Sequence, residues 1–277
     1  MQNIGGQAVI EGVLIRNENK IGIATLKNKK IKTVLWKLKE RPKFLRFFLI
    51  RGIYNLIETL IIGIKALNYS ADQQLEKEEK VSLLQLIITL IVSLGVGILI
   101  FKFFPLFLTE MLNRIFHLEN SVLFALLEGF LKLIIFVLYV LLISKMKDVK
   151  RIFEFHGAEH KVVNAYENKD LGNVRKYRVV HERCGSAFVF LVLFLTIVVY
   201  SFIPTSFDLW EKLVYRLLLL LPIISLGYEI LRFNSKYPNI ISKVLVYPGL
   251  LLQKLTVTEP NEEQVKVAME ALKKVLG

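Results

Sequence analysis

Long runs of apolar residues restrict the folds open to this chain more than any other feature. Four segments are long and apolar enough for an α-helix to cross a hydrocarbon layer roughly 30 Å thick, which takes about 20 residues. A soluble core explains runs of this length poorly. We therefore predict a mainly α-helical, polytopic membrane protein with about four transmembrane helices. The segments are approximately Leu83–Phe104, Val122–Ile143, Ala187–Ile203 and Leu213–Leu231.

Lysine and arginine residues are distributed unevenly among the connections between these segments. The connection from Ser144 to Gly185 carries ten of them, whereas the connection around 105–120 carries only Arg114 and that near Pro204–Trp210 carries none. Short cytoplasmic loops are enriched in these residues. The bias predicts a multi-pass protein of the cytoplasmic (inner) membrane, with both termini and the 144–185 connection on the cytoplasmic side.

The chain has a formal net charge of +13 and a single cysteine, Cys184. A strongly basic chain raises the question of nucleic-acid binding. Here the positive residues flank the apolar runs, which suits membrane topology and contact with anionic lipid headgroups. We therefore expect the lipid bilayer as a partner, and no nucleic acid. One cysteine excludes an internal disulfide bond and is typical of a reducing compartment.

The N-terminal segment alternates in hydrophobicity and lacks a helical period. Alternating stretches bounded by polar turns are typical of short antiparallel strands. We predict a small cytoplasmic β-meander of three strands, with Glu11-Gly12 as a bulge in the first. Glu11 either faces solvent or reaches the 144–185 connection as an additional carboxylate. The three strands are predicted over 8–15, 21–26 and 31–38.

The helix predicted over residues 44–67 differs from the four spanning candidates. Arg51, Glu58 and Lys65 recur at seven-residue intervals and form a polar stripe along one helical face. If this helix crossed the membrane, the basic N-terminal segment would lie outside the cytoplasm, against the charge bias. We favour an interfacial or re-entrant helix over a spanning one.

The C-terminal part contains a turn signal at Tyr247-Pro248-Gly249. It ends in a short amphipathic helix over 261–275, where Asn261 and Gln264 resemble a capping box. The predicted organisation is a cytoplasmic β-rich segment (1–43), an interfacial or re-entrant helix and linker (44–80), transmembrane helices 1 and 2 (81–143), a cytoplasmic His/Glu/Cys segment (144–185), transmembrane helices 3 and 4 (186–231) and a cytoplasmic C-terminal segment (232–277).

Three of the four histidines and the cysteine fall within the 144–185 segment. If residues 149–168 are helical, His156 and His160 lie one turn apart on one face, with Glu159 within about 60° of that face. Two imidazoles at this spacing can bind one zinc ion, and a neighbouring carboxylate can act on water as a general base.

His181 and Cys184 follow at a spacing of three residues, which suits the remaining positions of a tetrahedral site. The sequence therefore predicts a Zn²⁺ site of His156, His160 and either or both of His181 and Cys184, with Glu159 as the catalytic residue. Glu229, near the end of the last span, is an alternative third or fourth ligand.

The role of this constellation stays open from the sequence alone. Four protein ligands indicate a structural metal site, whereas an open position indicates a catalytic one. Without a metal, His156 and His160 would bond to headgroups or neighbouring loops, and Cys184 would be a small buried residue.

Glu128 and Lys132 are one turn apart in the second predicted span, with the glutamate first, the better orientation for pairing. Ionisable groups near the bilayer middle usually face the interior of a helix bundle. Two interpretations stay open: a path for ions or polar substrates, and a structural pair that also involves Arg51 or Glu58. Lys102, near the end of the first span, is expected to extend toward the interface.

Several motifs are distinctive when taken together. They are Gly5-Gly6-Gln7-Ala8-Val9-Ile10-Glu11-Gly12-Val13 with Arg16, His156-Gly157-Ala158-Glu159-His160-Lys161 with Asn164-Ala165-Tyr166-Glu167, His181 with Arg183-Cys184-Gly185, and Thr258-Glu259-Pro260. On these motifs the chain resembles the uncharacterised YqhQ-like family of bacterial membrane proteins over nearly its whole length. The family is labelled as predicted metal-dependent enzymes, a label that itself rests on the His/Glu/Cys pattern. The resemblance implies a bacterial membrane protein of this topology and names no substrate.

Three functional hypotheses follow. The leading one is a membrane-embedded, metal-dependent hydrolase that acts at the cytoplasmic face on a lipid-linked or peptide substrate. The second is an ion channel or transporter that uses Glu128 and Lys132, and a four-span chain would need to form a homo-oligomer to line a pore. The third is a non-catalytic membrane scaffold with a structural metal site or with no metal.

Overall fold

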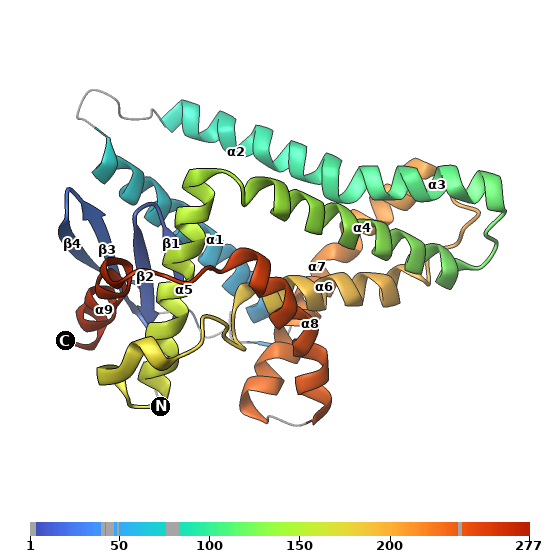
Figure 1. Cartoon of the computed structure of the whole chain (residues 1–277). Coiled ribbons are helices and arrows are strands. Elements are labelled where there is room, and N and C mark those ends of the chain that lie inside the picture. The colour runs from blue at the N-terminus through green and yellow to red at the C-terminus, as the bar shows by residue number, and fades with distance from the viewer. Residues whose placement is uncertain (1–3, 40–41, 43–46, 49, 76–82, 238–239) are drawn as a thin grey trace.

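The computed structural model describes residues 4–277 apart from 40–41, 43–46, 49, 76–82 and 238–239. A four-stranded sheet lies at one end of the molecule, and long helices extend away from it (Figure 1). Helices form most of the described chain. The predicted mainly helical class with a small N-terminal sheet is therefore confirmed.

The sheet is an antiparallel meander in the order β1-β2-β3-β4. Its turns contain residues in the left-handed conformation, with φ of 50° at Glu11 and 51° at Glu18. The strands are β1 (Ile4–Val9), β2 (Gly12–Asn17), β3 (Lys20–Lys27) and β4 (Lys30–Lys37).

The prediction of three strands was wrong at the first of them. A two-residue turn at Ile10-Glu11 divides the apolar stretch 8–15, so Glu11 belongs to a hairpin turn and not to a bulge. Glycine has low strand propensity, which hid Gly5-Gly6 from a sequence reading. In the structure both glycines pair with β2, and this pairing outweighs their weak preference.

Helices cover both faces of the sheet, because side chains alternate between the two faces of each strand. α1 (Ile50–Gln74) covers one face, and α5 (Lys147–Glu167) and α9 (Glu262–Leu276) cover the other. The core beneath α1 comprises Val9, Leu14, Ile21, Ile23, Ile62 and Ala66. The core beneath α5 and α9 includes Val13, Ile15, Ala24, Phe155, Val162, Ala268 and Leu272.

Three helical stretches among the described residues are long and apolar enough to cross a membrane: Ile87–Phe116, Ser121–Ile143 and Leu209–Phe233. The fourth predicted span corresponds to α6 (Gly185–Tyr200), which is apolar but has 16 residues. Two further differences from the prediction concern the connection around 105–120 and the turn at 247–249.

The first spanning stretch is longer than predicted. It includes most of α2 (Leu83–Ile98), the π-helical turn η2 (Leu99–Phe103) and α3 (Phe104–Phe116). The expected connection around 105–120 is thus helical as far as Phe116. Pro105, which has no backbone N–H to donate, lies just after the π-helical turn within this continuous helix.

The second correction concerns α8 (Ile240–Thr256), which contains Pro248 in its interior. The predicted turn at Tyr247-Pro248-Gly249 is therefore part of a helix. A Cβ atom at Gly249 would overlap the backbone of Ala187 in α6, so the glycine allows α6 and α8 to pack closely. The remaining elements are α4 (Ser121–Ile143), the 3₁₀ helix η3 (Leu171–Lys176) and α7 (Leu209–Lys236).

Candidate metal centre

α5 lies between the sheet and the beginning of α6 (Figure 1). Phe155, Ala158 and Val162 of α5 pack into the core shared with the sheet. This packing fixes the rotation of the helix about its axis. His156 and His160 then lie one turn apart on the neighbouring face, with their ring centroids 4.4 Å apart.

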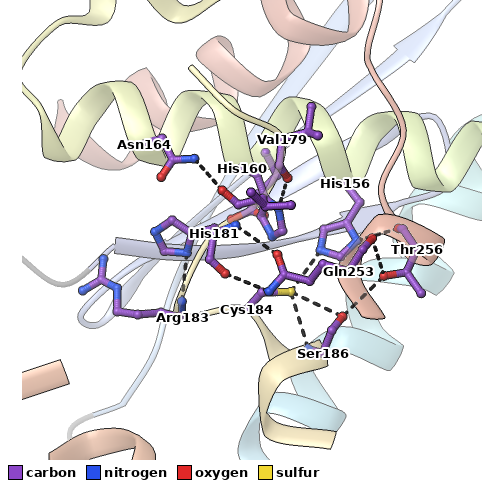
Figure 2. A network of polar contacts seen from close by, with 12 residues as sticks. His156, His160, Asn164, Val179, His181, Arg183, Cys184, Ser186, Gln253 and Thr256 are labelled. Carbon is purple, nitrogen blue, oxygen red and sulfur yellow. Dashed lines mark hydrogen bonds and ion pairs between the residues drawn. The ribbon is translucent and has the colours of Figure 1, made fainter. Parts of the chain in front are cut away.

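Cys184 completes a cluster with these two histidines. It is the N-cap residue of α6 and lies 24 residues beyond His160 in the sequence. Its Sγ is 3.4 Å from Nε2 of His156, and the ligand atoms of His156, His160 and Cys184 all lie within 4.8 Å of one another (Figure 2). The start of a helix favours negative charge, which suits a thiolate ligand at this position.

Backbone carbonyl groups orient both imidazole rings. Nδ1 of His156 lies 3.1 Å from the carbonyl oxygen of Thr256, and Nδ1 of His160 contacts the carbonyl oxygen of Val179. Since a carbonyl only accepts, each Nδ1 carries the proton and donates it. Each Nε2 therefore keeps its lone pair, the arrangement usual for histidines that bind metal ions.

Glu159 is buried beside the cluster, with 4% of its surface exposed. Its Oε2 lies 3.6 Å from Nε2 of His160. Burial raises the pKa of the Glu159 carboxyl above its ordinary value, against the opposing influence of His156 and His181. Burial also lowers the pKa of His160, which favours the neutral imidazole that metal ions require.

β1 passes directly over Glu159 at a glycine. A Cβ atom at Gly6 would lie 2.8 Å from both Cγ and Oε1 of Glu159, closer than packed side chains approach. The Gly-Gly motif near the N-terminus therefore leaves space for a carboxylate more than 150 residues away in the sequence.

His181 lies beside the cluster but has different partners. Its Nε2 is 3.3 Å from Oε1 of Glu167, and its Nδ1 accepts a hydrogen bond of 3.3 Å from the backbone N–H of Arg183. Both ring nitrogens are thus engaged, and the His/Cys cluster contains three of the four predicted ligands. Burial lowers the pKa of His181.

The segment that carries His181 and Cys184 is held by a residue that sequence reasoning missed. Gln253 of α8 is fully buried. Its Oε1 accepts from the backbone N–H of His181, and its Nε2 donates to the carbonyl oxygen of His181, each at 2.9 Å (Figure 2). The amide side chain that directly follows the leucine run 250–252 is the sequence signal that points to such a role.

The C-terminal segment closes over α5 at a second glycine. The backbone N–H of Thr258 donates to the carbonyl oxygen of Phe153 at 3.0 Å. A Cβ atom at Gly157 would overlap the carbonyl oxygen of Thr258. Gly157, between the first histidine and the glutamate of the motif, therefore permits the crossing that brings the carbonyl of Thr256 to His156.

The donor set fits a zinc ion. Two imidazole nitrogens and one sulfur are ligand atoms that Zn²⁺ prefers, and both rings are already oriented by their outer hydrogen bonds. Three protein ligands leave one position of a tetrahedron for water or substrate, as in catalytic zinc sites. Glu159 stands beside that set without belonging to it.

Other predicted site residues lie elsewhere. Glu229 does not reach the cluster: it pairs with Arg51 of α1, with Nε of Arg51 donating to Oε1 at 2.6 Å. Glu11 pairs with Arg151 near the start of α5. Glu128 and Lys132 form an ion pair of 2.5 Å in α4, but the further partner is Arg216 of α7 and not Arg51 or Glu58.

Comparison with known proteins identifies a matching family and a similar full-length protein. A family model described as "Protein of unknown function (DUF1385)" matches residues 47–277. The "Uncharacterized protein YqhQ" of Bacillus subtilis (strain 168) is 34% identical over 295 residues, which cover 98% of this chain and 92% of the relative. No solved structure matches the chain. The resemblance inferred from the motifs is confirmed.

Proposed function

We propose that this chain, which belongs to the DUF1385 family of proteins of unknown function, is a membrane-embedded, zinc-dependent hydrolase. It acts at the cytoplasmic membrane face on a lipid-linked or peptide substrate. The single observation that carries the proposal is the convergence of His156, His160 and Cys184 with both Nδ1 atoms turned to backbone carbonyls.

Each residue of the site has a role in this proposal. His156, His160 and Cys184 hold the ion and leave one position open. A zinc ion held there supplies a Lewis acid that makes water nucleophilic at neutral pH. Glu159 accepts the proton of the attacking water at a carboxylate oxygen and passes it to the leaving group. Gly6 and Gln253 keep Glu159 and the Cys184 segment in place.

The position of the centre supports a substrate at the membrane surface. Cys184 caps α6, an apolar helix, while α5 packs on the sheet. α1 covers the sheet with one face and exposes Ile57, Leu60 and Ile61, as an interfacial helix does. We propose that α6 is the fourth transmembrane helix, that α1 lies in the interface, and that both termini are cytoplasmic.

Metal content of the detergent-purified protein tests the proposal first. We expect about one zinc ion per chain by elemental analysis, and its loss in the His156→Ala/His160→Ala double variant while helicity by circular dichroism is retained. Absence of metal from the parent chain, even after zinc is supplied, would contradict the proposal and favour the transport or scaffold hypothesis.

The catalytic role requires a separate variant that keeps the metal. Glu159→Gln removes the base but none of the three ligands, so we expect zinc content to stay unchanged and turnover of any hydrolysed substrate to fall by about 10²–10⁴-fold. Glu182→Gln, an exposed neighbour of His181, is the matched control. Full activity of Glu159→Gln would leave the metal site intact and reject the assigned base.

A further inference from the structure

A second polar cluster is buried at the end of α6 that lies away from the metal centre. Glu128 and Lys132 come from α4, Arg216 comes from α7, and Lys102 comes from the π-helical turn η2. Glu128 is 1%, Arg216 2% and Lys132 6% exposed. Tyr200, the last residue of α6, lies among them. We refer to Lys102, Glu128, Lys132, Tyr200 and Arg216 as the cationic cluster.

One carboxylate serves several cations in this cluster. Nζ of Lys132 lies 2.5 Å from Oε1 of Glu128, and Nε of Arg216 donates to Oε2 at 2.8 Å. Lys102 forms no ion pair with any carboxylate in the described part of the chain; its Nζ lies 3.5 Å from the hydroxyl oxygen of Tyr200. Counted in their ionised forms, three cations face one anion, which leaves two positive charges uncompensated.

The aromatic ring of Tyr200 is shared by all three cations. Nζ of Lys132 and Lys102 lie 4.8 and 5.7 Å from the ring centroid, and the guanidinium carbon of Arg216 lies 5.1 Å from it. Cation–π attraction is weaker than the cost of burying an unpaired charge. The nearby Lys212 is already neutralised by Glu110 at 2.7 Å, so that pair supplies no spare anion.

The helix that contributes Lys102 changes locally from α-helical to π-helical geometry at this residue. This lysine is the only charged residue between Leu83 and Thr109, and it falls within the five residues of η2. π-helical turns are rare and are frequent at functional sites. The ammonium group of Lys102 is directed toward Tyr200 at the end of α6.

We propose that the cationic cluster binds a phosphate group, held by Lys102 and Lys132, while the hydroxyl of Tyr200 donates to the carbonyl oxygen of Arg216 at 2.8 Å. A phosphate monoester carries close to two negative charges at pH 7, which match the two uncompensated cations. Its oxygens can also accept hydrogen bonds from those ammonium N–H groups of Lys102 and Lys132 that do not donate to Glu128 or Tyr200.

The location suits either of two phosphate sources. Glu128 and Arg216 lie seven residues after Ser121 and Leu209, the first residues of α4 and α7, or about 10 Å along each helix. This depth can be reached by the terminal phosphate of a lipid or by a free phosphate ion. α6 places the cluster about 24 Å from Cys184, given its 16 residues, so the two sites are separate.

Calorimetric titration of the full-length, detergent-purified protein tests the proposal. Zinc is first removed with a chelator, so that phosphate cannot bind at the metal centre. The probes are inorganic phosphate, a short-chain phosphatidic acid and, as a control, short-chain phosphatidylcholine. We expect one inorganic phosphate or phosphatidic acid to bind per chain, and no binding of phosphatidylcholine, whose phosphate is a singly charged diester. Binding of phosphatidic acid alone identifies a lipid source, and binding of inorganic phosphate alone identifies a free ion; if both bind, the tighter of the two identifies the source.

Lys102→Met is the decisive variant, since it removes the cation that lacks a carboxylate and leaves the Glu128 ion pairs in place. We expect at least a tenfold loss of phosphate affinity, with a thermal midpoint without phosphate at or above that of the parent. Lys145→Met, at an exposed position after α4, should bind as the parent does. Equal affinity in Lys102→Met, or no binding of either phosphate probe to the parent, would overturn the proposal.

Discussion

Gly6 lies where β1 crosses Glu159 of α5, and its missing side chain leaves the volume that the carboxylate occupies. The preceding Gly5 is exposed and has no atom within 4 Å of a Cβ built on it. A methyl group added by substitution to alanine would therefore contact neighbouring atoms at Gly6 but none at Gly5. The pair separates the effect of strand propensity from that of close contact, which at Gly6 involves the carbonyl oxygen of Leu14 at 2.5 Å as well as Glu159.

We predict that Gly6→Ala displaces Glu159 or β1. Forcing a methyl group into a packed site costs about 1–3 kcal/mol, so the thermal midpoint should fall and turnover should fall with it. Gly5→Ala should leave both close to the values of the parent. Thermal unfolding and activity of the two variants check this, and equal behaviour of the two would show that Gly6 does not constrain the site.

The histidine pair could be predicted from the sequence because the two residues are close along the chain and belong to one helix. His156 and His160 share a face through the helical period alone, and the i, i+3 spacing drew attention to Cys184. The period does not say which distant residues approach that face. His181 was a candidate through its spacing from Cys184, and Glu229 through its place near the end of the last predicted span. In the structure Glu229 pairs with Arg51 and His181 contacts Glu167.

At the scale of elements, α8 supports the metal centre without supplying a ligand. The carbonyl of Thr256 at its end orients His156, and Gln253 one turn earlier holds the backbone of His181 on both sides. Gly249 brings the same helix against α6. α8 thus fixes the distance between α5 and the Cys184 segment.

Gln253→Ala is predicted to weaken zinc binding although Gln253 touches no ligand side chain. Removing the amide leaves the N–H and carbonyl of His181 without partners, at about 1–3 kcal/mol for each buried group, and loss of such outer contacts typically costs about 10–100-fold in metal affinity. Gln253→Glu keeps the acceptor for the N–H, so its loss should be intermediate.

Competition with a chromogenic chelator measures the zinc affinity of these variants. Lys254→Ala, an exposed neighbour on the same helix, controls for changes in α8 itself. Unchanged zinc affinity in Gln253→Ala, with a lowered thermal midpoint, would assign Gln253 a purely structural role.

Elements with strong periodicity were predictable, and their interruptions were not. The spans over α4 and α7 follow from hydropathy. The turn at Ile10-Glu11 contains no glycine or asparagine that would indicate a turn in the sequence. Pro248 indicates a turn, but the segment is helical in the structure and packs against α6 at Gly249. The π-helical turn η2 lies inside a continuous apolar run, where hydropathy cannot distinguish it from an α-helix.

At the scale of the whole molecule, α6 links two chemically different ends. The metal centre surrounds its first residue, next to the sheet, and the cationic cluster surrounds its last. The loops at the sheet end carry most of the positive charge of the connections, and the loops at the other end carry little. If α6 lies in the bilayer, the two sites open toward opposite sides of the membrane.

This orientation predicts which positions are accessible from outside intact cells. Asn19→Cys lies in a hairpin turn of the sheet, Lys274→Cys in α9 and Glu119→Cys between α3 and α4, and all three positions are exposed. Because positive loops stay in the cytoplasm, a membrane-impermeant maleimide should label only Glu119→Cys. The parent chain, with its half-buried Cys184, gives the background.

Labelling after the membrane is permeabilised supplies the complementary measurement. Asn19→Cys and Lys274→Cys should then react as fully as Glu119→Cys does in intact cells, which shows that their earlier silence reflects location and not burial. Labelling of Asn19→Cys but not Lys274→Cys in intact cells would mean that the number of crossings between them is odd. Because α9 packs on the sheet in one shared core, that result would contradict both this packing and the cytoplasmic placement of the two termini.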